Sequence, residues 1–99
     1  MTTPTLDIQH DTARSRFFAV VDGLQCEVDY QLTGTRMSVN HTRVPAQLEG
    51  RGIAAALVKH TLEWARSQDL QVVPVCSYVI AYLQRHPEYQ SLTAPRMAG

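Results

Sequence analysis

The sequence has little cysteine. Among its 99 residues only Cys26 and Cys76 carry thiols, and neither lies in a CxxC pair or in a Cys/His cluster with metal-ligand spacing. A secreted scaffold held together by disulfides normally carries more cysteines at this length. We therefore expect two reduced thiols and no metal.

Long apolar runs are also absent. No stretch approaches the ~20 apolar residues of a membrane span, and the first residues do not resemble a secretory signal. Apolar residues make up 44% and charged residues 18% of the chain, an ordinary globular composition. We expect one domain over residues 1–99, with a core at about 5–92 and a tail at 93–99. It should be cytoplasmic, with no membrane partner, and a monomer or weak dimer.

An excess of charge of one sign is missing, since nine basic residues balance nine acidic ones. The distribution is uneven. Residues 1–35 hold two basic and five acidic residues, net −3, whereas residues 36–66 hold five basic and two acidic ones, net +3. This positive centre suits a phosphorylated ligand. It is too sparse for the concentrated basic stripe that nucleic acid requires, so no nucleic-acid partner is expected.

The hydrophobic period changes near the middle of the chain. Residues 6–11, 16–21, 24–32 and 36–42 are predicted as four strands, and Asp22-Gly23 between the second and third is a strong hairpin signal. In the fourth strand Met37, Val39 and His41 are expected to share one side. From Gly52 onward the apolar residues fall at helical spacing.

Two helices and one further strand complete the pattern. We expect a helix from about residue 50 to 67, a strand at 70–75 and a second helix at 77–85 that ends at His86-Pro87. The strand at 70–75 is nearly all apolar and is expected to be buried on both faces, as a central parallel strand would be. The order β-β-β-β-α-β-α predicts an α/β fold (α+β mixed sheet) with an antiparallel meander and one β-α-β crossover.

The segment between the fourth strand and the first helix carries the main functional signal. Gly50 and Gly52 let the backbone turn tightly and approach a ligand. The first N–H groups of the following helix lack internal partners, which makes an anion site suited to phosphates. The bland alternative is a helix-start loop with no ligand.

A dinucleotide site is a second alternative, because Gly50, Gly52 and Ala55 satisfy G-x-G-x-x-A and Asp69 follows about 20 residues on. Three features disfavour it. The lead-in after Pro45 is polar, and the strand before the turn ends a meander. In addition, 99 residues cannot supply two mononucleotide-binding halves.

The run Gln47-x-x-Gly50-x-Gly52 resembles the Q/R-x-x-G-x-G/A motif of the GNAT acetyltransferases, whose backbone amides hold the coenzyme A pyrophosphate. The surrounding sequence resembles one small subfamily, the YjdJ-like proteins and their vertebrate relatives. The matching segments include His41-Thr42, Pro74-x-Cys76-x-Tyr78 and His86-Pro87-Glu88-Tyr89, within about residues 17–92.

The resemblance implies a minimal GNAT-like fold and an N-acetyltransferase that uses acetyl-CoA as cosubstrate, with an unidentified amine or protein as acceptor. The implied coenzyme-binding residues are Val44, Gln47, Leu48, Glu49, Gly50, Arg51, Gly52, Ile53, Ala54 and Ala55. Full-length relatives carry further helices and strands that shape the acceptor pocket. This chain lacks them, so a coenzyme site without a well-built acceptor cleft is expected.

Three residues are candidates for the chemistry. In the family the two strands beside the motif splay around the pantetheine arm, so His41 and Cys76 at their ends should face the thioester. Cys76 could take the acetyl group as a thiolate, His41 could accept a proton, and Tyr78 could protonate the leaving thiol. Each has a structural alternative: a small buried hydrophobe, a strand-end histidine and a packing tyrosine. Cys26 is interpreted as core and His10 as exposed.

Two further functions stay open on the sequence alone. One is a non-catalytic acyl-CoA-binding module that acts as a sensor or partner subunit. The other is a protein-interaction domain that has kept the fold without the ligand.

Overall fold

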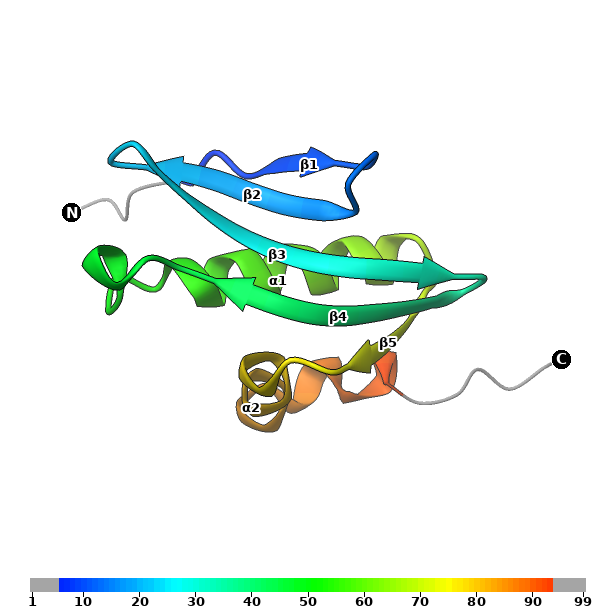
Figure 1. The fold of residues 1–99 in the computed structure, drawn as a ribbon. Helices are drawn as coiled ribbons and strands as arrows, with labels where there is room; N and C mark the ends of the chain where they lie inside the picture. The colour runs from blue at the N-terminus through cyan, green and yellow to red at the C-terminus, as the bar shows by residue number, and fades with distance from the viewer. Residues whose placement is uncertain (1–5, 94–99) are drawn as a thin grey trace, which may run out of the picture.

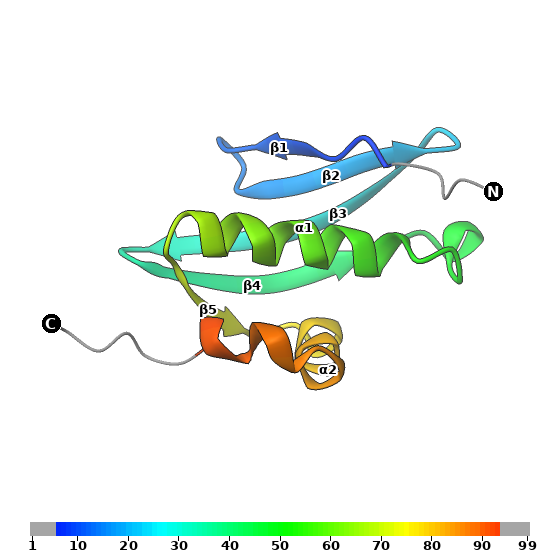
Figure 2. The same cartoon turned by 180° about the vertical axis from the view of Figure 1, so that it is seen from behind.

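A five-stranded sheet with its long helix on one face forms the molecule. The structure, a computed structural model, describes residues 6–93. The strands lie in sequence order, and each neighbouring pair is antiparallel except β4 and β5, which are parallel. Figures 1 and 2 show α1 across one face, here called the covered face. In the described part of the chain no helix lies over the opposite, open face, and α2 lies beside β5.

The order of elements confirms the predicted fold class and adds two short 3-10 helices. The elements are β1 (Gln9–Asp11), β2 (Arg16–Val21), β3 (Leu24–Thr33), β4 (Arg36–Arg43), η1 (Ala46–Leu48), α1 (Ile53–Ser67), β5 (Gln71–Pro74), α2 (Ser77–Arg85) and η2 (Pro87–Leu92). The 3-10 helices were not predicted because one or two turns leave no repeat in the hydrophobic pattern. Of the predicted tail at 93–99, all but Thr93 lies outside the described residues.

The predicted hairpin is confirmed between β2 and β3. Asp22 and Gly23 both have positive φ, 53° and 76°, as a two-residue turn matched to the strand twist requires. The strands then place alternate apolar residues on the covered face, where they pack against α1. The fully buried side chains include Phe17, Cys26, Val28, Met37, Val39, Leu57, Val58 and Leu62. Cys26 is core, as predicted.

β4 contains a bulge at Asn40. Tyr30 of β3 pairs with Val39, but the preceding β3 residue, Asp29, pairs with His41, so Asn40 is the extra residue on β4. Because side chains alternate along a strand, a single extra residue moves every later side chain to the other face.

The bulge overturns the prediction that His41 shares one side with Met37 and Val39. Those two side chains are fully buried on the covered face, whereas His41 is exposed and lies opposite Asp29 on the open face. Thr42 moves to the covered face in its place. The prediction failed because a polar, unpaired residue such as Asn40 leaves no mark in an apolar alternation.

The prediction of a buried, central strand at 70–75 is also wrong. β5 is the edge strand of the sheet, and Val75 just beyond it is 57% exposed. Pro74 ends the strand, since proline offers no N–H to a ladder. Of the predicted strand only Val72 is fully buried, and Leu70 packs against the core partly exposed.

Within residues 6–93 no helix is long and apolar enough to cross a membrane.

Candidate functional site

The turn before α1 offers space and free N–H groups to a ligand. Gly50 and Gly52 have φ of 85° and 78°, a conformation that favours glycine. Apart from chain neighbours, no described atom lies within 4 Å of where a Cβ would stand on either one. Gly52 caps α1, and its carbonyl accepts a hydrogen bond from the N–H of Ala56 at 3.1 Å. The N–H groups between them precede the first intrahelical bond, so they can bind an anion.

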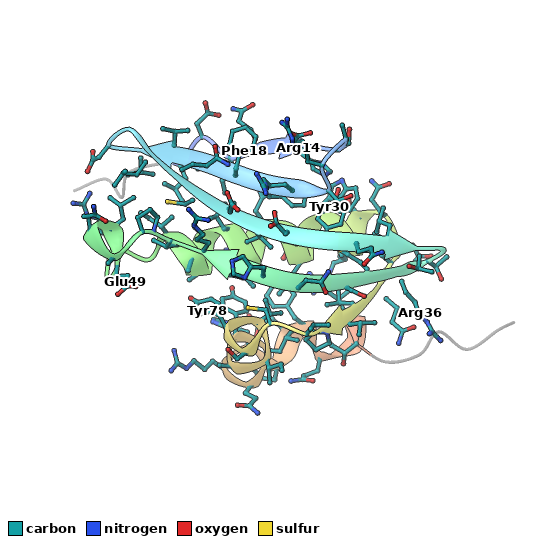
Figure 3. The ribbon with its side chains drawn as sticks, in the orientation of Figure 1. Arg14, Phe18, Tyr30, Arg36, Glu49 and Tyr78 are labelled. Atoms are coloured by element: carbon teal, nitrogen blue, oxygen red, sulfur yellow. The ribbon has the colours of Figure 1, made fainter. Side chains whose placement is uncertain are left out.

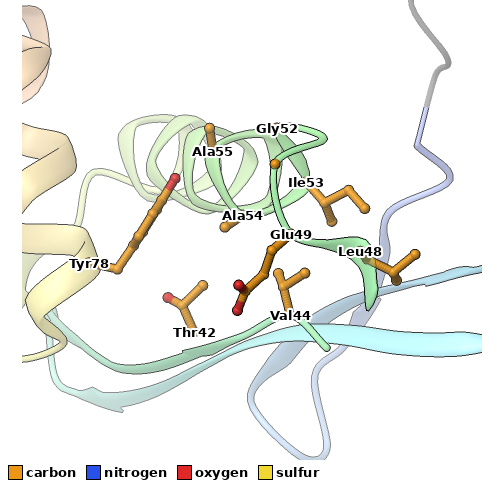
Figure 4. A pocket seen from close by; sticks show the side chains of 10 residues that line it. Thr42, Val44, Leu48, Glu49, Gly52, Ile53, Ala54, Ala55 and Tyr78 are labelled. Atoms are coloured by element: carbon orange, nitrogen blue, oxygen red, sulfur yellow. The ribbon is translucent and has the colours of Figure 1, made fainter. Parts of the chain in front are cut away.

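A cavity of about 460 Å³ opens beside this turn. Figure 4 shows it between the first turn of α1, the end of β4 and the start of α2. Its lining residues are Thr42, Val44, Leu48, Glu49, Gly50, Gly52, Ile53, Ala54, Ala55 and Tyr78. The size and the mixed polar and apolar lining suit a small-molecule ligand.

Most of the predicted coenzyme-binding residues line this cavity, and two do not. Gln47 lies exposed in η1, outside the lining. Arg51 turns away to form an ion pair with Asp22, with Nη1 and Oδ2 2.9 Å apart. That pair borders a neighbouring cavity of about 310 Å³ beneath the β2–β3 hairpin. The guanidinium of Arg51 is therefore not aimed at the cavity as the sequence suggested.

Two side chains project into the cavity from different elements. Tyr78 extends from α2 toward Ala54 and Ala55 of α1, so its ring forms one wall (Figure 4). The carboxylate of Glu49 points toward Thr42 and Val44 from the turn. Figure 3 shows Glu49 and Tyr78 at the same end of the molecule, far from Arg36 at the other end of β4.

The strands β4 and β5 separate at the wall of the cavity. Their parallel pairing ends at Val39 and Pro74. The N–H groups of Val75 and Cys76 then both donate to Val39 O, at 3.1 and 3.0 Å, while β4 continues to Arg43 paired with β3 only. This is the splay that the family resemblance implies.

Cys76 lies at this wall but is not among the residues that line the cavity. It caps the N-terminus of α2, and its Sγ is 3.6 Å from the hydroxyl oxygen of Thr42. Burial raises the pKa of Cys76, but N–H groups of Val79, Tyr78 and Thr42 and the Thr42 hydroxyl outweigh it. The pKa therefore lies below the ordinary value, as for a thiol that ionises readily.

Cys26 shows the opposite behaviour. It is fully buried in β3, and burial followed by the nearby charge of Glu27 raises the pKa of its thiol. Only one of the two free cysteines therefore has a reactive environment.

The structure brings Cys76 and Tyr78 to the cavity region but not His41, which the Asn40 bulge turns to the open face. Sequence reasoning missed Thr42, which lines the cavity and contacts Cys76. Its only sequence signal was its place in the matched pair His41-Thr42, where the histidine was the more familiar catalytic type.

No group of three or more His, Cys, Asp or Glu side chains within residues 6–93 could hold a metal ion. The cavity presents backbone N–H groups, the Tyr78 phenol, the Thr42 hydroxyl and the Glu49 carboxylate, with the Cys76 thiol beside Thr42.

Comparison with known proteins agrees with this geometry. The model of the GCN5-related N-acetyltransferase family matches residues 16–92, which is most of the chain. The solution structure of a GCN5-like protein from Staphylococcus aureus, described provisionally as an N-acetyltransferase, is similar with a TM-score of 0.72 and 25% identity. That match covers 93% of this chain and 89% of the other.

Vertebrate proteins called NATD1 are similar in sequence. The chicken (Gallus gallus) protein is 31% identical over 90 residues, which cover 88% of this chain and 82% of the relative. The human (Homo sapiens) protein is 32% identical over 88 residues, which cover 86% and 78%. The similarity thus extends over nearly the whole described chain and includes both the turn and the Cys76 segment.

Proposed function

The chain belongs to the GCN5-related N-acetyltransferase family, and on that premise we propose that it is an acetyl-CoA-dependent N-acetyltransferase of minimal size. The acceptor is an unidentified amine, free or on a protein. Two free cysteines suit a reducing compartment, so the proposal includes a cytoplasmic location.

The turn at Gly50 and Gly52 carries this proposal. A pyrophosphate needs several N–H donors on one side and no side chain in the way, and the start of α1 offers both. The cavity then continues between β4 and α2 to Thr42, whose hydroxyl oxygen lies 3.6 Å from Sγ of Cys76. A coenzyme bound by its phosphates at the turn would extend its thioester toward these two residues.

Cys76 would carry the acetyl group in two balanced steps. Its thiolate bonds to the acetyl carbon, the bond from that carbon to the coenzyme sulfur breaks, and the released coenzyme thiolate takes a proton from Tyr78 or water. The amine nitrogen then bonds to the same carbon, Cys76 leaves as thiolate, and the nitrogen loses a proton to water. His41 has no part in these steps because it lies on the open face.

A non-catalytic acyl-CoA-binding module is the second candidate, and two observations favour it. Cys76 is not among the lining residues, and none of the residues that line the cavity is a histidine that could act as a base. A site built for binding alone needs only the turn and the cavity.

Mass spectrometry after mixing with acetyl-CoA separates the two candidates. Transfer predicts a protein adduct of one acetyl group that is lost in Cys76→Ser and kept in Cys26→Ala. Coenzyme binding without adduct, together with no thiol release across a panel of amines and peptides, would support the module. Binding must be measured on the same samples, because loss of both binding and adduct would contradict the proposal as a whole.

A further inference from the structure

Thr42 holds a position that β4 reaches only through its bulge. If Asn40 were paired regularly instead of bulged, the alternation of β4 would place Thr42 on the open face and His41 toward the helices. With the bulge, Thr42 pairs with Val28 on the covered face and its side chain lines the cavity. The bulge thus exchanges a histidine for a hydroxyl at the wall beside Cys76. Bulges next to active sites commonly redirect a side chain in this way.

The splay of the strands lets the backbone of Thr42 face Cys76. β5 ends at Pro74, so this part of β4 has no strand partner on that side. The first turn of α2 lies there instead, and Sγ of Cys76 approaches Oγ1 of Thr42 to 3.6 Å. The Thr42 hydroxyl is thus a direct contact of this sulfur, and backbone N–H groups of Thr42, Tyr78 and Val79 act with it to lower the pKa of Cys76.

We propose that Thr42 is the positioning residue that aims the Cys76 sulfur at the cavity and holds it as a thiolate. The proposal rests on the proposed function, since it assigns a partner to the nucleophile of that reaction. In the thiol form, S–H donates to the Thr42 hydroxyl oxygen. After deprotonation the hydroxyl rotates and donates its own proton to the thiolate, because a hydroxyl can act in both roles.

Thr42 also accounts for the placement of Cys76 just behind the lining. The Thr42 side chain lines the cavity and the sulfur contacts its hydroxyl oxygen, so Thr42 stands between Cys76 and the cavity. A charged sulfur in this place needs donors from both elements, since α2 alone supplies only the N–H groups of its first turn.

The test is the pH profile of Cys76 alkylation by iodoacetamide, followed at that residue by mass spectrometry. In Thr42→Val the midpoint should rise by about 1 to 2 pH units, which is the size expected for one lost hydrogen bond to a charged group. Thr42→Ser keeps the hydroxyl and should restore the midpoint to that of the wild type. Unchanged midpoints in Thr42→Val, or equal midpoints in the valine and serine variants, would overturn the proposal.

Thr61→Val is the matched control. It removes a buried hydroxyl that donates to Leu57 O at 2.8 Å in α1, and it should leave the Cys76 midpoint unchanged. If Thr42→Val does not fold, Thr42→Ala removes the same hydroxyl without the added methyl group and is judged by the same midpoint.

The assay needs no coenzyme, which keeps the two proposals distinguishable. If acetyl-CoA neither binds nor reacts, the proposed function fails while the shift in midpoint still stands. If the adduct forms on Cys76 and the midpoint does not move in Thr42→Val, only the role of Thr42 fails. If both hold, the rate of adduct formation at saturating acetyl-CoA should also fall in Thr42→Val and recover in Thr42→Ser.

Discussion

The two halves of α1 differ in what surrounds them. The first turn faces the cavity with free N–H groups, glycines before it and no acidic residue of its own. The second half is enclosed by rings: Trp64 lies 4.7 Å from His10 and 5.6 Å from Phe17 between ring centroids. One helix therefore has one end where binding is proposed, called the binding end, and one end that is packed among rings, called the stabilising end.

The stabilising end explains an error in the sequence analysis. His10, which was expected to be exposed, stacks on Phe17 at 4.0 Å and lies 2.6 Å from the Tyr30 hydroxyl through Nε2. Burial, followed by repulsion from His60, lowers the pKa of His10. His10 of β1 thus packs among the rings at the second half of α1, whereas the first turn of α1 borders the cavity.

If the halves have separate roles, changes at the binding end should alter coenzyme affinity and changes at the other end should alter stability. The largest expected effect is that of Gly52→Asp. A carboxylate there would lie where the phosphates bind, and we expect coenzyme A affinity to fall at least ~100-fold by isothermal titration calorimetry. The positive φ of 78° adds a modest strain that aspartate tolerates better than most residues.

Gly34→Asp is the control for that strain. Gly34 also has positive φ, 62°, with no described atom near its Cβ position, but it lies in the β3–β4 hairpin away from the cavity. It should lose similar stability and keep coenzyme binding. Equal binding in both variants would mean that the turn is not the phosphate site.

The second prediction concerns the other end of α1. The Tyr89 hydroxyl donates to Glu63 at 2.5 Å, and Arg66 lies 5.0 Å above the Tyr89 ring. The bond to Glu63, aided by burial, raises the pKa of Tyr89 to about 12. Tyr89→Phe should lower the free energy of unfolding by about 1 kcal/mol near neutral pH and leave coenzyme affinity unchanged.

The contribution of Tyr89 to the free energy of unfolding should depend on pH. A tyrosine whose pKa is higher in the folded than in the unfolded chain adds stability that is complete below the ordinary pKa of 10. This stability is lost as the pH rises toward about 12. Urea unfolding of Tyr89→Phe should therefore show less loss across that window than the wild type. Glu63→Gln keeps an acceptor without the charge and should remove most of the same dependence; an unaltered loss in both would contradict the assignment.

The turns were predicted from the sequence more accurately than the faces on which the candidate catalytic side chains lie. The turns at Asp22-Gly23 and Gly50-x-Gly52 could be predicted because a positive φ favours glycine and aspartate, so the residue types themselves indicate the turns. The place of His41 depended on whether Asn40 pairs, which neighbouring strands decide and no local pattern records. The position of β5 was predicted wrongly for a similar reason. An apolar run indicates that a strand is buried, but it does not show whether a further strand pairs with its outer edge.

The smallest expected effect concerns Glu49, a negatively charged residue beside a site that is proposed to bind phosphates. Its side chain starts at the turn where the phosphates are proposed to bind, and its carboxylate points into the cavity toward Thr42 and Val44 (Figure 4). Glu49 is exposed, so solvent screens its repulsion and the effect should be modest. We expect Glu49→Gln to tighten coenzyme A binding about two- to fivefold, more at low salt than at high salt, with unchanged stability.

Calorimetric titration at two salt concentrations tests this, with Glu88→Gln as a control for net charge. Glu88 lies in η2, outside the cavity lining, and its replacement should leave the affinity unaltered. Weaker binding in Glu49→Gln would instead mean that the carboxylate accepts a hydrogen bond from the coenzyme. The free N–H groups of α1 would then be only part of the recognition, and the turn would act through a side chain as well as through its backbone.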